Sequence, residues 1–197
     1  VVWALIPINN FNASMSRLSH LLNQEERTEL TKTLASQTLK ILNKIETIDK
    51  IIVMTHESEW IQSLSIKKII TIDEFDVHSL KKKIEKASNW IEKQNVKRMM
   101  YLSIDLPFVT QADVELFIDS HKKGITIVEA NKDGGTNALI LDMPRMIDFQ
   151  FGENSFKKHV RSAENANITI RIFNNKALSL DLDDENDFKK FKSITSP

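Results

Sequence analysis

The chain has 197 residues, with 27 Lys or Arg and 27 Asp or Glu, so its formal net charge is zero and no overall basic field attracts nucleic acid or an anionic membrane. The absence of cysteine excludes disulfides, thiolate catalysis and zinc–cysteine sites. With no apolar run long enough for a membrane helix, we expect a soluble cytoplasmic protein that forms one domain over residues 1–197.

The first third of the chain alternates between apolar runs and an amphipathic segment. Residues 1–8 form an apolar run that ends near a proline, which predicts a buried strand followed by a loop. Apolar residues recur at helical spacing over 25–45, and Asn23 is in place to cap this helix. Two further apolar runs, 50–55 and 67–72, predict the next two strands.

The middle of the chain continues the alternation. Apolar residues at helical spacing over 80–91 predict an amphipathic helix with lysines on its outer face. The apolar run 98–105 predicts a strand, and Thr110 with Asp113 has the spacing of a capping box for the following helix. Such alternation predicts an α/β fold with a mostly parallel sheet and helices on both faces.

The last third is expected to be richer in strands, with two short helices near its end. The expected strands are 125–130, 137–141, 168–173 and 178–183, and the expected helices follow residue 154 and residue 184. Ligands of such sheets bind beyond the carboxyl ends of the strands, which directs attention to the loops.

Aspartates follow two of the predicted strands. Asp105 closes the strand 98–105, and Asp181 and Asp183 would share one face of the strand 178–183. Together they could hold Mg²⁺, which prefers oxygen ligands. Asp105 could instead cap a turn, and the acidic residues near 183 could instead be the first turn of a helix.

Two glycine-containing stretches carry candidate anion donors. In the first, Gly134 and Gly135 precede Thr136 and Asn137, whose amides and side chains could contact an anionic substrate, although a simple hairpin turn has the same spacing. In the second, Gly152 and Ser155 precede a helix, where Ser155 could bind a phosphate or carboxylate, or could simply cap the helix.

Histidine and motif patterns narrow the possible chemistry. The histidines show no metal-binding spacing, and only His159, one helical turn after Ser155, could face the candidate site instead of solvent. The chain has no nucleophile elbow, no Walker A motif and no G-x-G-x-x-G sequence, which argues against serine hydrolases, P-loop enzymes and dinucleotide folds. The five histidines are His20, His56, His78, His121 and His159.

Five segments, taken in order, resemble one enzyme family. The stretches "ALIPI…SRLS…EER", "IDLPFVT", "GGTNALIL", "FGENSFKKH" and "LSLDLDDENDF" are similar to the CofC/FbiD guanylyltransferases of deazaflavin coenzyme F-420 biosynthesis. Those enzymes couple GTP to 2-phospho-L-lactate or a related three-carbon phosphate. The resemblance implies a three-layer, nucleotidyltransferase-like fold of the Rossmann-like GT-A type, usually homodimeric, that uses Mg²⁺.

The resemblance also implies roles for individual residues. The aspartates 105, 181 and 183 would be the catalytic metal ligands. The phosphorylated acid would be bound by Thr136, Gly152 and Ser155, with Gly135, Asn137 and His159 beside them. The GTP loop would contain Pro7, Ser16 and Arg17.

Two positions depart from the family pattern, both expected on the nucleotide side. Met15 stands where the family has a lysine before "SRL", and Lys81 stands in a segment that usually reads Leu-Asn-x-Ala-Leu. They motivate a second hypothesis, a degenerate paralogue that binds the acid or nucleotide without much chemistry. A third hypothesis is another sugar-phosphate or cofactor nucleotidyltransferase, but the glycine-rich first loop of those enzymes is missing.

Overall fold

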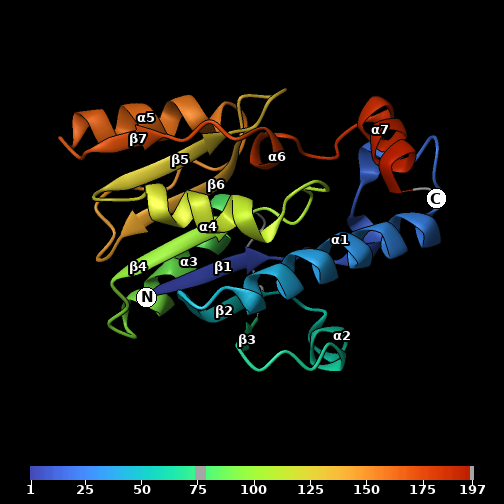
Figure 1. Ribbon diagram of the computed structural model, residues 1–197, viewed down its shortest axis with the longest axis horizontal. Helices are drawn as coiled ribbons and strands as arrows, with labels where there is room; N and C mark the ends of the chain where they lie inside the picture. The colour runs from blue at the N-terminus through green and yellow to red at the C-terminus, as the bar shows by residue number, and fades with distance from the viewer. Residues whose placement is uncertain (74–78, 196–197) are drawn as a thin grey trace.

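A single mixed sheet forms the centre of the protein, for which a computed structural model describes residues 1–73 and 79–195. Its strand order is β3-β2-β1-β4-β6-β5-β7 (Figure 1). Only β6 runs antiparallel to its neighbours β4 and β5, so the prediction of a mostly parallel sheet is confirmed. The strands are β1 (Val2–Pro7), β2 (Ile48–Met54), β3 (Ile69–Ile72), β4 (Arg98–Leu102), β5 (Ile125–Glu129), β6 (Thr136–Asp142) and β7 (Ile170–Ile172).

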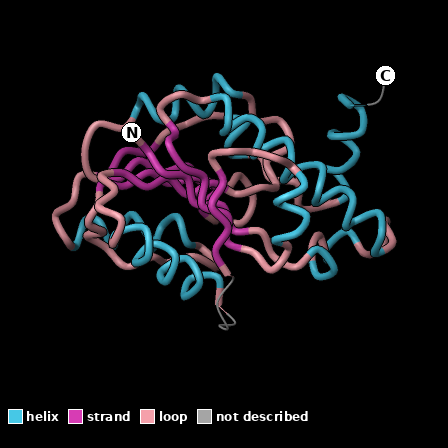
Figure 2. The backbone as a smooth tube through the Cα atoms, turned by 90° about the horizontal axis from the view of Figure 1, so that it is seen from below, coloured by secondary structure: helices cyan, strands magenta, loops and turns pink. Residues whose placement is uncertain are grey.

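Helices cover both faces of this sheet, which gives three layers (Figure 2). One face packs against α1 and α4, and the other packs against α3 and α5. The short α7 lies apart from the sheet, beside the first turns of α1 (Figure 1). The helices are α1 (Gln24–Lys44), α2 (Ser58–Ser63), α3 (Leu80–Glu92), α4 (Gln111–Ser120), α5 (Ser155–Asn165), α6 (Lys176–Ser179) and α7 (Glu185–Thr195), with 3-10 turns η1 (Phe11–Ala13) and η2 (Ser16–Leu18).

The alternation of side chains along β1 explains why both faces need a helix. Ala4 and Ile6 belong to the core on the α1 side, where Phe117 of α4 is fully buried. Leu5 belongs to the core on the other side, with Ile84 of α3. Successive residues of a strand point to opposite faces, so a strand that is apolar at every position is stable only between two helical layers.

Both predicted helix starts are confirmed. The Asn23 side chain accepts from the backbone N–H of Glu26, whose carboxylate accepts from the Asn23 N–H in return, so α1 begins with a capping box. Thr110 and Asp113 form the same reciprocal pair at the start of α4. Each pair satisfies two backbone donors that the first turn of a helix leaves unpaired.

The expectation of a strand at 178–183 is wrong, and the last third is not richer in strands. The side chain of Asn175 accepts from the N–H of Leu178, which starts the short helix α6 instead. The residues that follow bond to loops beyond other strands: Asn131 N–H donates to Ser179 O at 2.9 Å, and Leu182 N–H donates to Asp105 O at 2.8 Å. This segment therefore crosses the end of the sheet without adding a strand to it.

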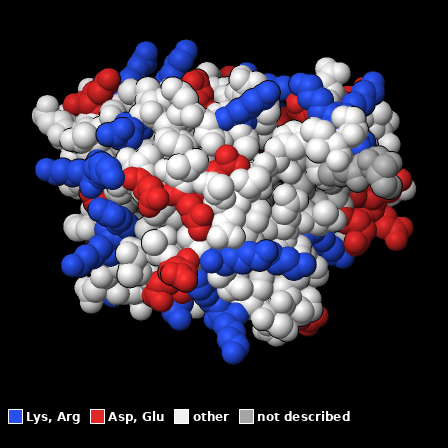
Figure 3. All heavy atoms as spheres, viewed as in Figure 1, with Lys and Arg blue, Asp and Glu red and all other residues white. Residues whose placement is uncertain are grey.

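The distribution of charged side chains on the surface is consistent with a formal net charge of zero. On the face shown in Figure 3, basic and acidic side chains are interspersed, with no continuous field of one sign. None of the helices in the described part of the chain is both long enough and apolar enough to pass through a bilayer.

Candidate active site

A cleft opens where the loops after β1 and β4 meet the start of β6. It consists of two adjoining cavities of about 290 and 620 Å³, which share Arg17, Tyr101, Asp105 and Asp183 among their lining residues. Eleven of the twelve residues predicted for the site line one or both cavities. The smaller cavity holds Pro7 and Ser16 with the shared Arg17, Asp105 and Asp183, and the larger adds Gly135, Thr136, Asn137, Gly152, Ser155 and Asp181.

Three aspartates gather in this cleft from the middle and the end of the chain. Burial raises the pKa of Asp105. The hydrogen bond that its carboxylate accepts from Ser103 Oγ at 2.5 Å lowers this pKa, and the negative charge of Asp183 raises it. Burial raises the pKa of Asp181 to about 7, and the charges of Asp105 and Asp183 contribute. Like charges therefore act on Asp105 and Asp181, and they are offset only where positive charge lies nearby.

Arg17 supplies part of that positive charge by forming an ion pair with Asp183. One oxygen of Asp181, Oδ1, is buried without a hydrogen-bond partner. Over residues 1–73 and 79–195, no three His, Asp or Glu side chains already stand close enough together to hold a metal ion. The donor chemistry suits a hard cation, but Asp183 would have to exchange Arg17 for it, and the metal role remains a prediction.

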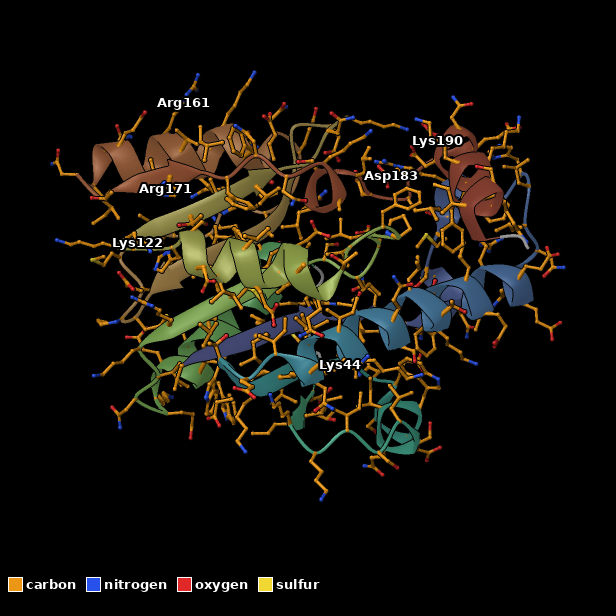
Figure 4. All side chains as sticks on the ribbon, in the orientation of Figure 1. Lys44, Lys122, Arg161, Arg171, Asp183 and Lys190 are labelled. Carbon is orange, nitrogen blue, oxygen red and sulfur yellow. The ribbon has the colours of Figure 1, made fainter. Side chains whose placement is uncertain are left out.

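The first turn of α7 fixes the backbone that carries Asp183. The carboxylate of Asp187 accepts from the N–H groups of Asp183 and Asp184, both at 3.2 Å. It also pairs with Lys132 Nζ at 2.6 Å, and the Asp187 side chain is only 5% exposed. Figure 4 shows Asp183 in the segment between α6 and α7. The interpretation of 184–187 as an acidic helix start is therefore correct for this part of the acidic run.

The glycine pair is both a turn and part of the cleft wall. Gly134 has φ +64°, and its carbonyl accepts from the N–H of Phe156 at 3.0 Å, which fastens the turn between β5 and β6 to the start of α5. The N–H of Ser155 donates to Gly152 O at 3.1 Å. These two backbone donors of α5 are therefore already used within the protein. Ser155 and Thr136 contribute their side-chain hydroxyls to the polar groups of this wall.

Ser155 is the first residue of α5 and not its N-cap, which is Asn154 in a left-handed conformation with φ 53°. The side chain of Ser155 points instead toward β6, where its Oγ donates to Thr136 Oγ1 at 3.1 Å. Ser155 is 1% exposed and Thr136 is 7% exposed, and both line the larger cavity. The capping alternative for Ser155 is thus wrong.

His159 is the one predicted site residue that does not line the cleft. Its side chain is fully buried behind the wall formed by Thr136 and Ser155, so the alternative of a solvated helix histidine is also wrong. Its Nδ1 lies 3.0 Å from Thr136 Oγ1, and its Nε2 accepts from the N–H of Gln150 at 2.8 Å. His159 can influence a ligand only through Thr136.

Of the other histidines, the three that the structure describes do not line either cavity. His121 is buried at the opposite end of the sheet, 2.9 Å from Thr126 Oγ1 and 3.2 Å from Asp142 Oδ1. His20, later in the loop after β1, is exposed near Glu185, and His56, after β2, is exposed near Asp73. His78 lies outside the described residues.

Several cleft residues were not anticipated from the sequence. Tyr101 and Ser103 come from the end of β4, and Asp133 comes from the turn before the glycine pair. Burial and the charge of Asp105 raise the pKa of Tyr101, which keeps its hydroxyl protonated. Asn137 lines the larger cavity, and its Nδ2 is buried without a hydrogen-bond partner. The signal for Tyr101 and Ser103 was their place at the end of a buried strand that leads to Asp105.

The loop after β1 forms the wall of the smaller cavity. Met15 adopts a left-handed conformation with φ 52°, and Leu18 N–H donates to its carbonyl at 2.9 Å. Leu18 is fully buried against the α1–α7 cluster, which anchors the loop. Lys81 is in α3 and is not among the described residues that line either cavity, although its neighbour Leu80 lines both, so its expected place on the nucleotide side stays a prediction.

Comparison with known proteins shows the family of this chain. A family model described as "Guanylyl transferase CofC like" matches residues 2–192. The chain belongs to the CofC-like guanylyl transferase family. Both the resemblance and the prediction of a nucleotidyl-transferring enzyme are thereby confirmed, and the cleft described above is the candidate active site of a CofC-like protein.

Individual relatives cover nearly all of this CofC-like chain. The 2-phospho-L-lactate guanylyltransferase of Methanobrevibacter smithii is 27% identical over 186 residues, 94% of this chain and 81% of that protein. The phosphoenolpyruvate guanylyltransferase of Sphaerobacter thermophilus is 23% identical over 188 residues, 95% of this chain and 90% of that protein. A solved 4-diphosphocytidyl-2C-methyl-D-erythritol synthase of Anaerococcus prevotii superposes with TM-score 0.69 at 10% identity, covering 100% of this chain and 96% of that one. The nucleotidyltransferase-like fold is confirmed.

Proposed function

We propose that the protein transfers GMP from GTP to a phosphorylated three-carbon acid, such as 2-phospho-L-lactate, phosphoenolpyruvate or 3-phosphoglycerate, and releases pyrophosphate. We further propose that it acts as a cytoplasmic single-domain homodimer in deazaflavin coenzyme F-420 biosynthesis, with Mg²⁺ as its metal. One observation carries the proposal: the cleft places three carboxylates between an arginine-bearing loop and a wall of hydroxyl and amide donors. This is the arrangement needed for two phosphorylated substrates and a cation.

The reaction depends on positioning the two substrates more than on proton transfer. A phosphate oxygen of the acid forms a bond to the α-phosphorus of GTP, while the bond from that phosphorus to the pyrophosphate oxygen breaks. The attacking oxygen is already ionised, so neither a protein nucleophile nor a general base is required. The bound Mg²⁺ would neutralise and orient the phosphates of both substrates. The cleft accordingly contains aspartates and donors, but no serine–histidine pair of the nucleophilic kind: Ser155 donates to Thr136, and His159 is buried behind it.

The two cavities suggest where each substrate lies. We assign GTP to the smaller cavity, where Pro7 and Ser16 line the loop and Arg17 can pair with a phosphate. We assign the acid to the larger cavity, beside Thr136 and Ser155. Asp105 and Asp183 line both cavities and Asp181 lines the larger one, so these three aspartates would hold the cation between the reacting phosphates.

A second candidate is a paralogue that binds one substrate but turns over slowly. Met15 favours it, because a thioether replaces a cation in the loop that would hold the triphosphate. Its signature would be acid or GTP binding without pyrophosphate release.

The proposal is tested by measuring pyrophosphate release with GTP, Mg²⁺ and each of the three acids. We expect turnover with at least one acid, loss of most activity in Asp105→Asn, and retained activity in the control Asp119→Asn, an exposed residue of α4. Folding of both variants is checked by circular dichroism. Folded protein that binds GTP but releases no pyrophosphate with any acid would instead support the non-catalytic paralogue. Near-normal turnover of Asp105→Asn would refute its role at the metal.

A further inference from the structure

The hydrogen bonds of His159 determine which of its nitrogens carries a proton. The backbone N–H of Gln150 donates to Nε2 at 2.8 Å. A backbone N–H can only donate, so Nε2 has to be the unprotonated nitrogen. A neutral imidazole has one N–H, which must then be on Nδ1.

The surroundings of His159 keep the ring neutral. It is fully buried, with the rings of Phe149 and Phe151 at 6.4 and 5.0 Å between centroids. Burial, followed by the positive charge of Lys81 on α3, lowers the pKa of His159 to about 4. A ring protonated on both nitrogens is thus excluded near neutral pH, and the Nδ1–H tautomer is the remaining form.

The next link is Thr136. His159 Nδ1 lies 3.0 Å from Thr136 Oγ1, so Nδ1–H donates and the hydroxyl oxygen accepts. Ser155 Oγ also donates to Thr136 Oγ1, at 3.1 Å. With both lone pairs of Thr136 engaged, its own hydrogen has no partner in this chain of bonds. Rotating the two hydroxyls reverses their mutual bond but still leaves one hydrogen, because the histidine cannot accept it.

We propose that His159 is a positioning residue that makes the Thr136–Ser155 pair an obligatory hydrogen-bond donor toward the larger cavity. This inference rests on the proposed function, and it deepens that function by naming what the acid pocket recognises. Both hydroxyl residues line the cavity, whereas His159 is sealed from it. The histidine therefore acts on the substrate only through the hydroxyl that it orients.

An obligatory donor favours a group that always accepts. An ionised carboxylate or phosphate oxygen accepts in every orientation, whereas an ammonium group or the NH₂ side of an amide offers only hydrogens to the donor. The unpartnered amide Nδ2 of Asn137, in the same cavity, is a second donor of the same kind. The wall formed by β6 and α5 thus recognises the ionised end of the acid.

The tautomer is the direct test, and it needs neither substrate nor variant. Long-range ¹H–¹⁵N spectra of ligand-free, ¹⁵N-labelled protein near pH 7 report which nitrogen of each histidine is protonated, and the spectrum of His159→Asn assigns the His159 signals. We expect a neutral His159 with its proton on Nδ1. A proton on Nε2, or on both nitrogens, overturns the inference even if the enzyme is active.

Kinetics test the consequence for binding. Thr136→Val should raise the KM for the acid roughly 10- to 100-fold, because a hydrogen bond to a charged group is lost, while the KM for GTP stays unchanged. Thr136→Ser should restore most of the loss. His159→Phe should raise the same KM, and His159→Asn, which can still donate to Thr136, should recover part of it. A folded Thr136→Val or His159→Phe protein with an unchanged KM for the acid refutes the donor role.

The end of the acid that meets the donor is identified with a carboxyl methyl ester of the acid substrate. If the carboxylate meets the Thr136 hydroxyl, Thr136→Val should no longer affect the KM for the ester. If the penalty persists with the ester, the phosphate meets it. In both cases the obligatory donor is supported. Absence of turnover by the wild-type protein with every acid refutes the proposed function instead, and the tautomer measurement then still decides the hydrogen-bond chain.

Discussion

Replacing His159 should change how the stability of the protein depends on pH. The pKa of His159 is lowered from its ordinary value of 6.5 to about 4 in the folded chain. A group whose folded pKa is depressed contributes stability that is complete above the unfolded pKa. That contribution decreases as the pH falls from 6.5 toward 4, because His159 binds a proton in the unfolded chain over this range, whereas the buried ring of the folded chain stays unprotonated.

The magnitude follows from the two pKa values. At pH 5, about 1.5 units below the unfolded pKa, one proton is bound almost fully in the unfolded state and hardly at all in the folded state. At about 1.4 kcal/mol per pH unit, this difference in proton binding at His159 lowers the free energy of unfolding by about 2 kcal/mol between pH 7.5 and pH 5. His159→Gln has no titrating ring and should lack this component.

The assay is urea denaturation of the wild-type protein and His159→Gln at pH 7.5 and pH 5, followed by circular dichroism. The variant is expected to be less stable at pH 7.5 but to lose about 2 kcal/mol less on acidification. His20→Gln is the matched control, because that ring is 58% exposed. Equal pH dependence in the wild type and His159→Gln would refute the claim that burial keeps this ring neutral.

Three other substitutions test the scaffold, each by urea denaturation. Phe117→Ala should lower the free energy of unfolding by about 3–5 kcal/mol because the Phe117 side chain is fully buried. Leu116→Ala, at the exposed neighbouring position, should cost much less, and similar losses in the two variants would contradict the packing described. Asn23→Ala should lower the free energy of unfolding by about 1 kcal/mol because the α1 cap is lost, whereas Asn23→Asp should keep most of the stability that the cap provides. Lys132→Met should cost about 1–3 kcal/mol by leaving the buried Asp187 without its cation, whereas the exposed pair lost in Lys189→Met should matter little.

Much of the scaffold could be predicted from local patterns. The helix start at Asn23, the capping box at Thr110 and the amphipathic helix α3 depend on residues within a few positions of one another, and all are confirmed. The segment 178–183 was mistaken for a strand because its alternation has a period of two. What decided its structure was the Asn175 cap and the bond from Leu182 to Asp105, which join distant parts of the chain.

The candidate site shows the same division. Residues near the ends of predicted strands, such as Asp105 and Thr136, could be placed in a common cleft from topology together with the family resemblance. The burial of His159 could not, because it depends on Phe149 and Phe151 closing over the ring from a loop whose path the sequence pattern leaves open. The ion pair of Arg17 with Asp183 was equally hidden, since 166 positions separate the two residues.

The position of α7 makes the C-terminal part of the chain a structural support of the candidate active site. Through Phe191 it rests on Leu18, next to the arginine loop, and through Asp187 it holds the segment that bears Asp183. A deletion or a bulky fusion at this helix would therefore disturb both walls of the cleft at once, although α7 itself contacts neither proposed substrate. Val1, by contrast, is 80% exposed at the end of the strands opposite the cleft (Figure 1), so a substitution there would leave both walls undisturbed.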